Sequence, residues 1–350
     1  MSASKRTLQD ETKAATATTT TPARDGNHTG DDDNSSGGAA AGAAQPESAA
    51  AAAFDFRPTA CGACGGDEPK FFGWRGGAAH HGGAGVRTRL VRCGLCTHIY
   101  PNPMPFPARG LDDLYTDTDE YFHGHDVEAK KANALESIRS IEQQLGRRGR
   151  YLDVGCGLGE NLWAARESGW EYEGVDVSAA YLKRAEELLG VRGRQGTLEE
   201  VNYPDNHFDA ITMSAILEHL YDPYATLREV YRVLKPGGLF WFDAPNEDGL
   251  YMRMGNLYMK AQGRDWVVTL APTFSPYHVQ GFNPRSLRRL VARAGFEVES
   301  FRMHGTVWPP TGAQTLRKRI EYRGAQLINW VGQRAGAGIY LYVAARKPAN

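Results

Sequence analysis

A short glycine-rich loop constrains the fold of this chain more than any other feature. Residues 153–159 read DVGCGLG and overlap the end of the segment Tyr151 to Val154, which is typical of a short strand. Residues 160–168 are typical of a helix. Glycine supplies the positive φ that so tight a strand-to-helix turn needs, and it lets a ligand approach the backbone. Amides at a helix N-terminus favour a carboxylate or phosphate. The loop therefore predicts a ligand-binding turn.

Beyond about residue 111 the chain alternates between segments with strand patterns and segments with helix patterns. Such alternation predicts an α/β fold, in which helices cover both faces of a mostly parallel sheet. The predicted strands are 151–154, 172–177, 208–213, 238–242, 297–303 and 339–345, and the predicted helices are 126–145, 160–168, 179–189, 223–233 and 284–294.

The spacing of the loop glycines discriminates between two kinds of cofactor. A dinucleotide-binding fold expects G-x-G-x-x-G, and the last position of that pattern is Glu160 here. This difference disfavours a dehydrogenase. Asp176 ends the second predicted strand, where a carboxylate can accept hydrogen bonds from both hydroxyls of a ribose. The two features together indicate a nucleoside cofactor other than a dinucleotide.

Several ordered motifs resemble those of class I S-adenosylmethionine-dependent methyltransferases. The resemblance extends from about Cys61 to Arg346 and implies a Rossmann-like methyltransferase sheet. The motifs are YLDVGCGLGEN at 151–161, EGVDVS at 173–178, FDAI at 208–211, LEHL at 217–220 with DP at 222–223, and LKPGG at 234–238.

The resemblance also implies S-adenosylmethionine as cofactor and suggests which residues hold it. The implied contacts are Asp153 at the amino group, Gly155, Gly157 and Gly159 along the methionine part, Asp176 at the ribose, Val177 on the adenine, and Thr197 and Leu198 at the adenine edge. Many relatives have aspartate at the position of Thr197. A threonine hydroxyl is a weaker acceptor for the adenine amine.

Two histidines are candidates for catalysis. A hydroxyl or carbon acid that accepts a methyl group needs a base, whose contribution is about 10²–10⁴-fold. His278 resembles a histidine that relatives place near the substrate, and His219 follows the fourth strand, where a structural or cofactor-side role is the alternative. We also expect residues ahead of the core to cover the cofactor, namely Tyr115, Tyr121, His123 and His125.

Two matched cysteine pairs predict a zinc site. Cys61 and Cys64 form one C-x-x-C pair, and Cys93 and Cys96 form the other. Two such pairs present four thiolates in the tetrahedral arrangement that structural zinc prefers. Because protein ligands fill all four positions, we expect a structural ion rather than a catalytic one. The fifth thiol, Cys156, is expected to be closely packed in the glycine loop.

Three further histidines lie near the cysteines. We expect His98 to be a surface neighbour of the metal site rather than a ligand. The gap between the cysteine pairs is longer than usual, and the excess, residues 76–85, is expected to form a loop that bulges into solvent with His80 and His81.

The sequence divides into three parts. Residues 1–53 have almost no large apolar side chains and are expected to be a disordered tail. Residues 54–107 form the predicted zinc ribbon, which ends in a proline-rich stretch, 101–107, that predicts a stiff connector. Residues 108–350 form the methyltransferase domain. Within it, 247–280 is a long excursion that predicts a substrate lid or, alternatively, a helical hairpin packed on the core.

Charge and composition narrow the choice of partner. The formal net charge is −1, so there is no overall attraction to nucleic acid. No apolar run approaches the roughly 18 residues of a membrane span, and no signal peptide is evident, so we expect a cytoplasmic protein. We predict a small-molecule acceptor: a sugar, a lipid or a secondary metabolite. The sequence does not indicate the oligomeric state.

Two alternatives remain open at this stage. One is an RNA methyltransferase whose ribbon binds nucleic acid through Arg87, Arg89 and Arg92. The other is a non-catalytic relative that only binds the cofactor or a partner. The intact glycine loop and Asp176 disfavour the second alternative.

Overall fold

The structure is a computed structural model that describes residues 52–78, 80, 83–115, 126–305 and 315–349. The predicted tail lies outside these residues except for its last two positions.

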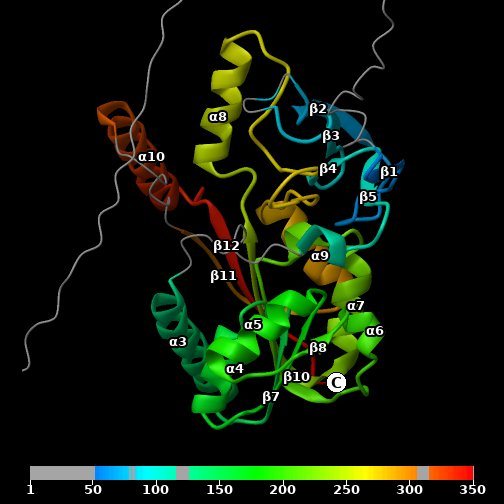
Figure 1. The fold of residues 1–350 in the computed structure, drawn as a ribbon, viewed down its shortest axis with the longest axis vertical. Coiled ribbons are helices and arrows are strands. Elements are labelled where there is room, and N and C mark those ends of the chain that lie inside the picture. The colour runs from blue at the N-terminus through cyan, green and yellow to red at the C-terminus, as the bar shows by residue number, and fades with distance from the viewer. Residues whose placement is uncertain (1–51, 79, 81–82, 116–125, 306–314, 350) are drawn as a thin grey trace, which may run out of the picture. The chain divides into compact units, whose positions relative to one another are not determined.

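A seven-stranded sheet forms the centre of the catalytic part (Figure 1). Its order is β11-β12-β10-β9-β6-β7-β8. From β10 to β8 in this order, each strand is parallel to its neighbour. Strand β12 runs antiparallel to both β10 and β11. The strands are β6 (Arg150–Val154), β7 (Glu171–Asp176), β8 (Arg194–Gln195), β9 (Phe208–Ser214), β10 (Leu234–Pro245), β11 (Glu297–His304) and β12 (Tyr340–Arg346). The predicted α/β fold is confirmed.

Two apolar layers cover the sheet because neighbouring strand residues point to opposite faces. Leu152 belongs to a cluster with residues of α7 (Pro223–Val233) and α9 (Pro284–Ala294). Tyr151 belongs to the opposite cluster, which includes residues of three other helices. These are α3 (Val127–Leu145), α4 (Glu160–Glu167) and α5 (Ala179–Leu189).

Capping residues explain where several helices begin. The carboxylate of Asp222 accepts from the amide of Ala225 at 3.0 Å, and Pro223 takes the first helical position of α7. Asn283 caps α9 in the same way, ahead of Pro284. A short polar acceptor followed by proline is a strong start signal, and both helices begin at the predicted residue.

The cysteine-rich part contains two small sheets. Strands β2 (Pro69–Arg75), β3 (Thr88–Cys93) and β4 (Ile99–Pro101) form one, and β1 (Phe54–Arg57) pairs with β5 (Met104–Pro107) in the other. The proline-rich stretch 101–107 is extended, as predicted, but its last four residues pair with β1 instead of only connecting the two parts. Proline fits β5 because a strand at the edge of a sheet needs hydrogen bonds on one side only.

Two helices were not predicted individually. The excursion after β10 contains α8 (Leu250–Ala261), and α10 (Leu316–Arg334) lies between β11 and β12. Shorter elements also appear: α6 (Leu198–Val201) and the 3₁₀ turns η1 (Asp112–Tyr115) and η2 (Leu217–His219). Within the described residues, each helix is too short or too polar to cross a bilayer.

Candidate functional site

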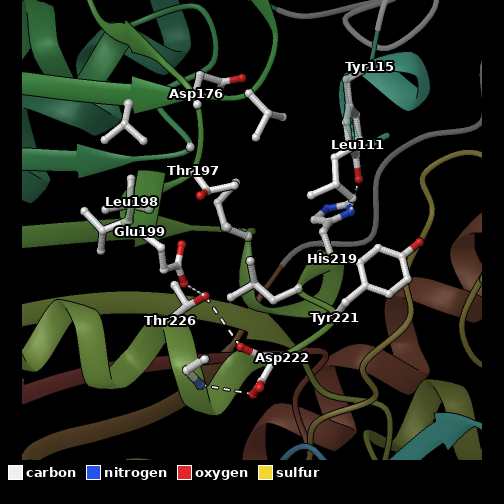
Figure 2. A pocket seen from close by; sticks show the side chains of 18 of the residues that line it. Leu111, Tyr115, Asp176, Thr197, Leu198, Glu199, His219, Tyr221, Asp222 and Thr226 are labelled. Carbon is white, nitrogen blue, oxygen red and sulfur yellow. Dashed lines mark hydrogen bonds between the residues drawn. The ribbon is translucent and has the colours of Figure 1, made fainter. Parts of the chain in front are cut away.

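A pocket of about 270 Å³ lies beside the glycine loop (Figure 2). It brings together predicted residues that are far apart in the sequence. Those that line it are Gly155, Asp176, Val177, Thr197, Leu198 and His219. Asp153, Gly157, Gly159 and His278 are not among its lining residues, so their predicted contacts with a cofactor or substrate stay predictions.

The position of the pocket follows from the strand order. Gly155 comes directly after β6, Asp176 is the last residue of β7, and Thr197 follows β8. The chain then returns to β9 on the other side of β6. In an open parallel sheet, ligands bind beyond the carboxyl ends of the strands where the strand order reverses.

The glycine loop is held against β7. Gly155 has a φ of 71°, and a Cβ placed on it would lie 2.2 Å from the side chain of Ile216. The amides of Gly155 and Cys156 donate to the carbonyl of Val175, at 2.8 and 3.1 Å. Both the conformation and the close approach require glycine at position 155. Cys156 is buried, as the sequence predicted.

Asp176 connects the loop to the pocket. One carboxylate oxygen accepts from the amide of Gly157 at 2.8 Å, and the other accepts from the amide of Ser178 at 2.9 Å. Burial raises the pKa of Asp176, and the two backbone amides oppose that rise. The carboxylate is thus fixed at the pocket wall by backbone donors.

Asp153 lies deeper than predicted. It is buried and accepts from the hydroxyl of Thr212 at 2.5 Å and from the amide of Asn161 at 3.4 Å. Burial raises its pKa to about 7, although both hydrogen bonds lower it. The side chain therefore stabilises the end of β6 from beneath the loop.

Thr197 has a structural role of its own. It is the N-cap of α6, and its hydroxyl oxygen accepts from the amide of Glu200 at 3.3 Å. The side chain of Glu200 accepts in return from the amide of Thr197, which completes a capping box. The hydroxyl oxygen is thus already used as an acceptor by the helix.

His219 faces the pocket beside an aromatic residue. Its Nδ1 lies 3.1 Å from the hydroxyl of Tyr115, which also lines the pocket. Figure 2 shows the two side chains pointing toward one another. Burial lowers the pKa of His219 to about 4, against the raising effect of the carbonyls of Tyr277 and Pro276. The imidazole is therefore neutral near pH 7.

His278 lies behind His219. The centroids of the two rings are 4.8 Å apart, and Nε2 of His278 is 4.0 Å from a carboxylate oxygen of Glu218. Burial lowers the pKa of His278 and raises that of Glu218. Because both groups are buried, the neutral imidazole of His278 and the protonated carboxyl of Glu218 are favoured.

The four predicted cysteines converge. Sulfur atoms of Cys61 and Cys96 are 3.5 Å apart, those of Cys64 and Cys93 are 3.6 Å apart, and all four lie within 4.8 Å of one another. A tetrahedral ion with Zn–S bonds of about 2.3 Å separates its ligands by about 3.8 Å. The cluster is therefore compatible with a zinc ribbon.

Two expectations about histidines near the ribbon were wrong. His98 is fully buried rather than on the surface, and its Nε2 lies 2.7 Å from Oε1 of Gln280. His80 packs against the rings of Trp266 and Phe274 instead of lying in a solvated loop. In both cases the segment after β10 covers the ring, a contact that local sequence does not reveal. His81 lies outside the described residues.

The excursion after β10 contacts the ribbon at several points. Arg92 makes two hydrogen bonds to the carboxylate of Asp248, at 3.0 and 2.9 Å. Ile99 and Gly281 exchange backbone hydrogen bonds. Among the described residues of 247–280, none lines the pocket, so the lid remains a prediction.

Some lining residues were missed from the sequence. Tyr115 was predicted to cover the cofactor and lines the pocket, whereas Tyr121, His123 and His125 lie outside the described residues. The unpredicted lining residues include Leu111, Tyr181, Ile216 and Tyr221. Ile216 lies two positions after β9, and that proximity to a strand end was the available signal for it.

The sheet order and the pocket define a Rossmann-like α/β protein of the methyltransferase type. The family described as "Methyltransferase domain" matches residues 125–300, and the chain belongs to that family. The matched part contains the glycine loop, Asp176 and both candidate catalytic histidines. It does not include the cysteine ribbon.

Named relatives share moderate identity with this part. The ubiquinone biosynthesis O-methyltransferase of Nitrosospira multiformis is 31% identical over 155 residues, which cover 42% of this chain and 62% of that protein. A protein of Mycolicibacterium smegmatis named as a probable S-adenosylmethionine-dependent methyltransferase is 30% identical over 167 residues, covering 45% and 57%. The chain thus spans less than two thirds of the length of these two relatives.

Solved structures are similar to this chain at lower identity. A SAM-dependent methyltransferase from Archaeoglobus fulgidus is 21% identical with a TM-score of 0.45, covering 65% of this chain and 97% of that one. An S-adenosylmethionine-dependent methyltransferase from Mesorhizobium loti is 22% identical with a TM-score of 0.42, covering 61% and 96%.

Proposed function

We propose that this protein transfers the methyl group of S-adenosylmethionine to a small-molecule acceptor. The observation that carries the proposal is the pocket at the carboxyl ends of β6, β7 and β8, which the glycine loop and Asp176 border, in a chain of the methyltransferase-domain family. The names of the relatives, which include an O-methyltransferase, support an oxygen acceptor.

The residues present fit this cofactor. Asp176 would accept from the ribose hydroxyls, Val177 and Leu198 would contact the adenine, and the Gly155 backbone would lie along the methionine part. When bound, the cofactor supplies an electrophilic methyl group on its sulfonium. The protein's own contribution is to hold an acceptor in line with that group, which can be worth about 7–11 kcal/mol.

The pocket geometry favours His219 over His278 as the group that contacts the acceptor. His219 lines the pocket and is neutral near pH 7, so its imidazole can accept a proton. A pKa of about 4 makes it a weak base. It is therefore best matched to an acceptor whose own hydroxyl is acidic, such as a phenol or an enol. His278 would act as a positioning residue behind it.

We propose that the four cysteines hold a structural zinc ion. Backbone amides of Cys64, Gly66 and His98 lie against the sulfurs of Cys61, Cys64 and Cys96, as suits thiolate ligands. Zinc would add on the order of 10–16 kcal/mol to the folding of such a unit.

The contacts of the ribbon arginines support a small molecule over RNA. Arg92 is paired with Asp248, whereas Arg87 and Arg89 lie over the rings of Trp74 and Phe71. All three arginines of this strip therefore already have partners within the protein, which speaks against a dedicated nucleic-acid interface.

Turnover tests the proposal. The full chain would be incubated with S-adenosylmethionine and, separately, phenolic, sugar and lipid acceptors, and S-adenosylhomocysteine would be measured. We expect acceptor-dependent release that His219→Gln lowers by about 10²–10⁴-fold while cofactor binding is kept. Release only with RNA, in a salt-dependent manner, would contradict the small-molecule assignment.

A further inference from the structure

Helix α8 presents its apolar side chains to solvent. Tyr251, Met254, Leu257 and Tyr258 follow a spacing of three and four residues, which places them on one face, and each is 40% to 62% exposed. The opposite face of α8 packs against the rest of the chain. The side chain of Asn256 donates to the hydroxyl of Thr269 at 2.9 Å and accepts from a backbone amide at 2.8 Å.

Helix α10 is arranged in the same way. Leu316, Ile320, Leu327 and Val331 repeat at intervals of four and seven residues, so they share one face, and Trp330 adjoins them. These five side chains are 41% to 73% exposed. The buried side of α10 is polar or small: Asn329 donates to the carbonyl of Gly305 at 2.8 Å. The usual orientation, with the apolar stripe toward the core, is reversed.

The two helices are neighbours. A Cβ placed on Gly332 near the end of α10 would lie 3.1 Å from the Cβ of Leu250, the first residue of α8, and the amide of Leu250 donates to the carbonyl of Ala337 at 2.9 Å. Figure 1 shows both helices beyond the ends of the strands rather than over the sheet. An extended apolar surface of this kind normally has a partner.

The same helices are strongly basic. Together they carry seven lysine and arginine residues and one acidic residue, Glu321, in a chain whose net charge is −1. Arg253 and Lys260 flank the apolar face of α8. Arg319 lies beside the apolar stripe of α10, and Arg323 interrupts that stripe. Positive charge beside an apolar stripe is typical of a helix that lies in a membrane interface.

We propose that the outward face of α8 and α10 docks on the surface of an anionic phospholipid bilayer. The apolar stripes would enter the boundary between headgroups and acyl chains, and the basic residues would contact the headgroups. The aromatic side chains of Tyr251, Tyr258 and Trp330 suit that depth because each combines an apolar ring with a polar group.

Charge favours the bilayer over a second copy of the chain. A two-fold symmetric contact would bring two strongly positive faces together, with one carboxylate on each to offset them. An anionic bilayer supplies both the opposite charge and an apolar layer. Since its readout is vesicle binding, this proposal is independent of the proposed methyl transfer.

Sedimentation with vesicles tests the proposal. The full chain would be mixed with vesicles of phosphatidylcholine alone and with vesicles in which phosphatidylglycerol replaces a third of that lipid. We expect binding to the anionic vesicles that weakens as salt is raised. Leu257→Glu combined with Leu327→Glu should weaken it by at least about tenfold. Arg319→Glu should weaken vesicle binding more at low salt than at high salt.

Leu188→Glu is the matched control, because Leu188 is 44% exposed but lies on α5. It should bind vesicles as the wild type does. Circular dichroism and thermal unfolding should show that all variants are folded. The proposal is overturned if the folded wild type does not bind anionic vesicles, or if the double variant binds them as well as Leu188→Glu does. It is also overturned if light scattering shows that the wild type is a dimer and the double variant is a monomer.

Discussion

The imidazole of His98 lies 2.7 Å from the side-chain oxygen of Gln280, and both side chains are buried. The amide nitrogen of Gln280 donates to the carbonyl of Leu220 at 2.9 Å, so its oxygen must accept from Nε2 of His98. The backbone amide of Gln280 donates to the carbonyl of Glu218. The cysteine ribbon is thereby connected through buried hydrogen bonds to the turn that carries His219.

This connection predicts a cost when Gln280 is replaced. Gln280→Leu leaves the Nε2–H of His98 and the carbonyl of Leu220 without their partner. A buried donor without a partner costs about 1–3 kcal/mol, so the unfolding free energy should fall by that amount. Denaturant unfolding of the variant checks this, with Gln144→Leu, on the exposed side of α3, as control. Equal stability of the two variants would contradict the role given to this contact.

Loss of a cysteine should affect the ribbon and the site together. Cys93→Ser removes one of four thiolates, and zinc content measured by atomic absorption should fall from one ion per chain to well below one. Because the ribbon holds the turn around His219, binding of S-adenosylmethionine should also weaken. Cys156→Ser is a control outside the cluster and should keep the zinc. A wild-type protein that folds and binds the cofactor with no zinc would contradict the structural assignment.

Stability should depend on the protonation of Asp243. Burial raises the pKa of this β10 residue to about 7, from an unperturbed value near 3.8. The folded state holds the proton more tightly than the unfolded state does. The contribution of Asp243 to the free energy of unfolding is therefore fully present below about pH 4 and is lost as pH rises through 7. The melting temperature should therefore fall between pH 5 and pH 8. The melting temperature of the Asp243→Asn variant should fall less over that range. Parallel pH curves for the two proteins would show that Asp243 does not titrate as inferred.

A substitution at the adenine edge of the pocket should increase the affinity for S-adenosylmethionine. Thr197→Asp keeps a good N-cap for α6, because aspartate caps helices as well as threonine does. The new carboxylate adds an acceptor for the adenine amine, so we expect S-adenosylmethionine to bind about fivefold more tightly, or about 1 kcal/mol. Calorimetry measures this directly. Thr197→Ser should bind like the wild type, and weaker binding by the aspartate variant would place the adenine elsewhere.

Much of the fold could be predicted because local signals mark it. The pairs Asp222-Pro223 and Asn283-Pro284 begin helices at the predicted residues, and the glycine loop with Asp176 predicted where the pocket lies. These features depend on neighbours in the sequence. Thr197 was expected at the pocket from the family resemblance alone, which did not indicate its capping role.

The remaining features depend on contacts between distant segments. The burial of His98 requires Gln280, which is 182 positions away, and no local pattern marks that pair. The apolar stripe of α10 is interrupted by Arg323 and Gly324 and faces outward, so it does not indicate a core helix. Asp176 and His219 were predicted near strand ends, and both line the pocket. The sequence did not predict that His278 is absent from the lining.

Calorimetric titration of the full chain with S-adenosylmethionine tests the central claim most directly, beside Asp176→Ala and the control Asp265→Ala. Asp265 has a side chain that is 65% exposed and lies outside the pocket lining. We predict binding in the micromolar range by the wild type and by Asp265→Ala, and a loss of at least about 2 kcal/mol, roughly thirtyfold, for Asp176→Ala. Folded wild-type protein that does not bind, or an Asp176 variant that binds equally well, would contradict the account.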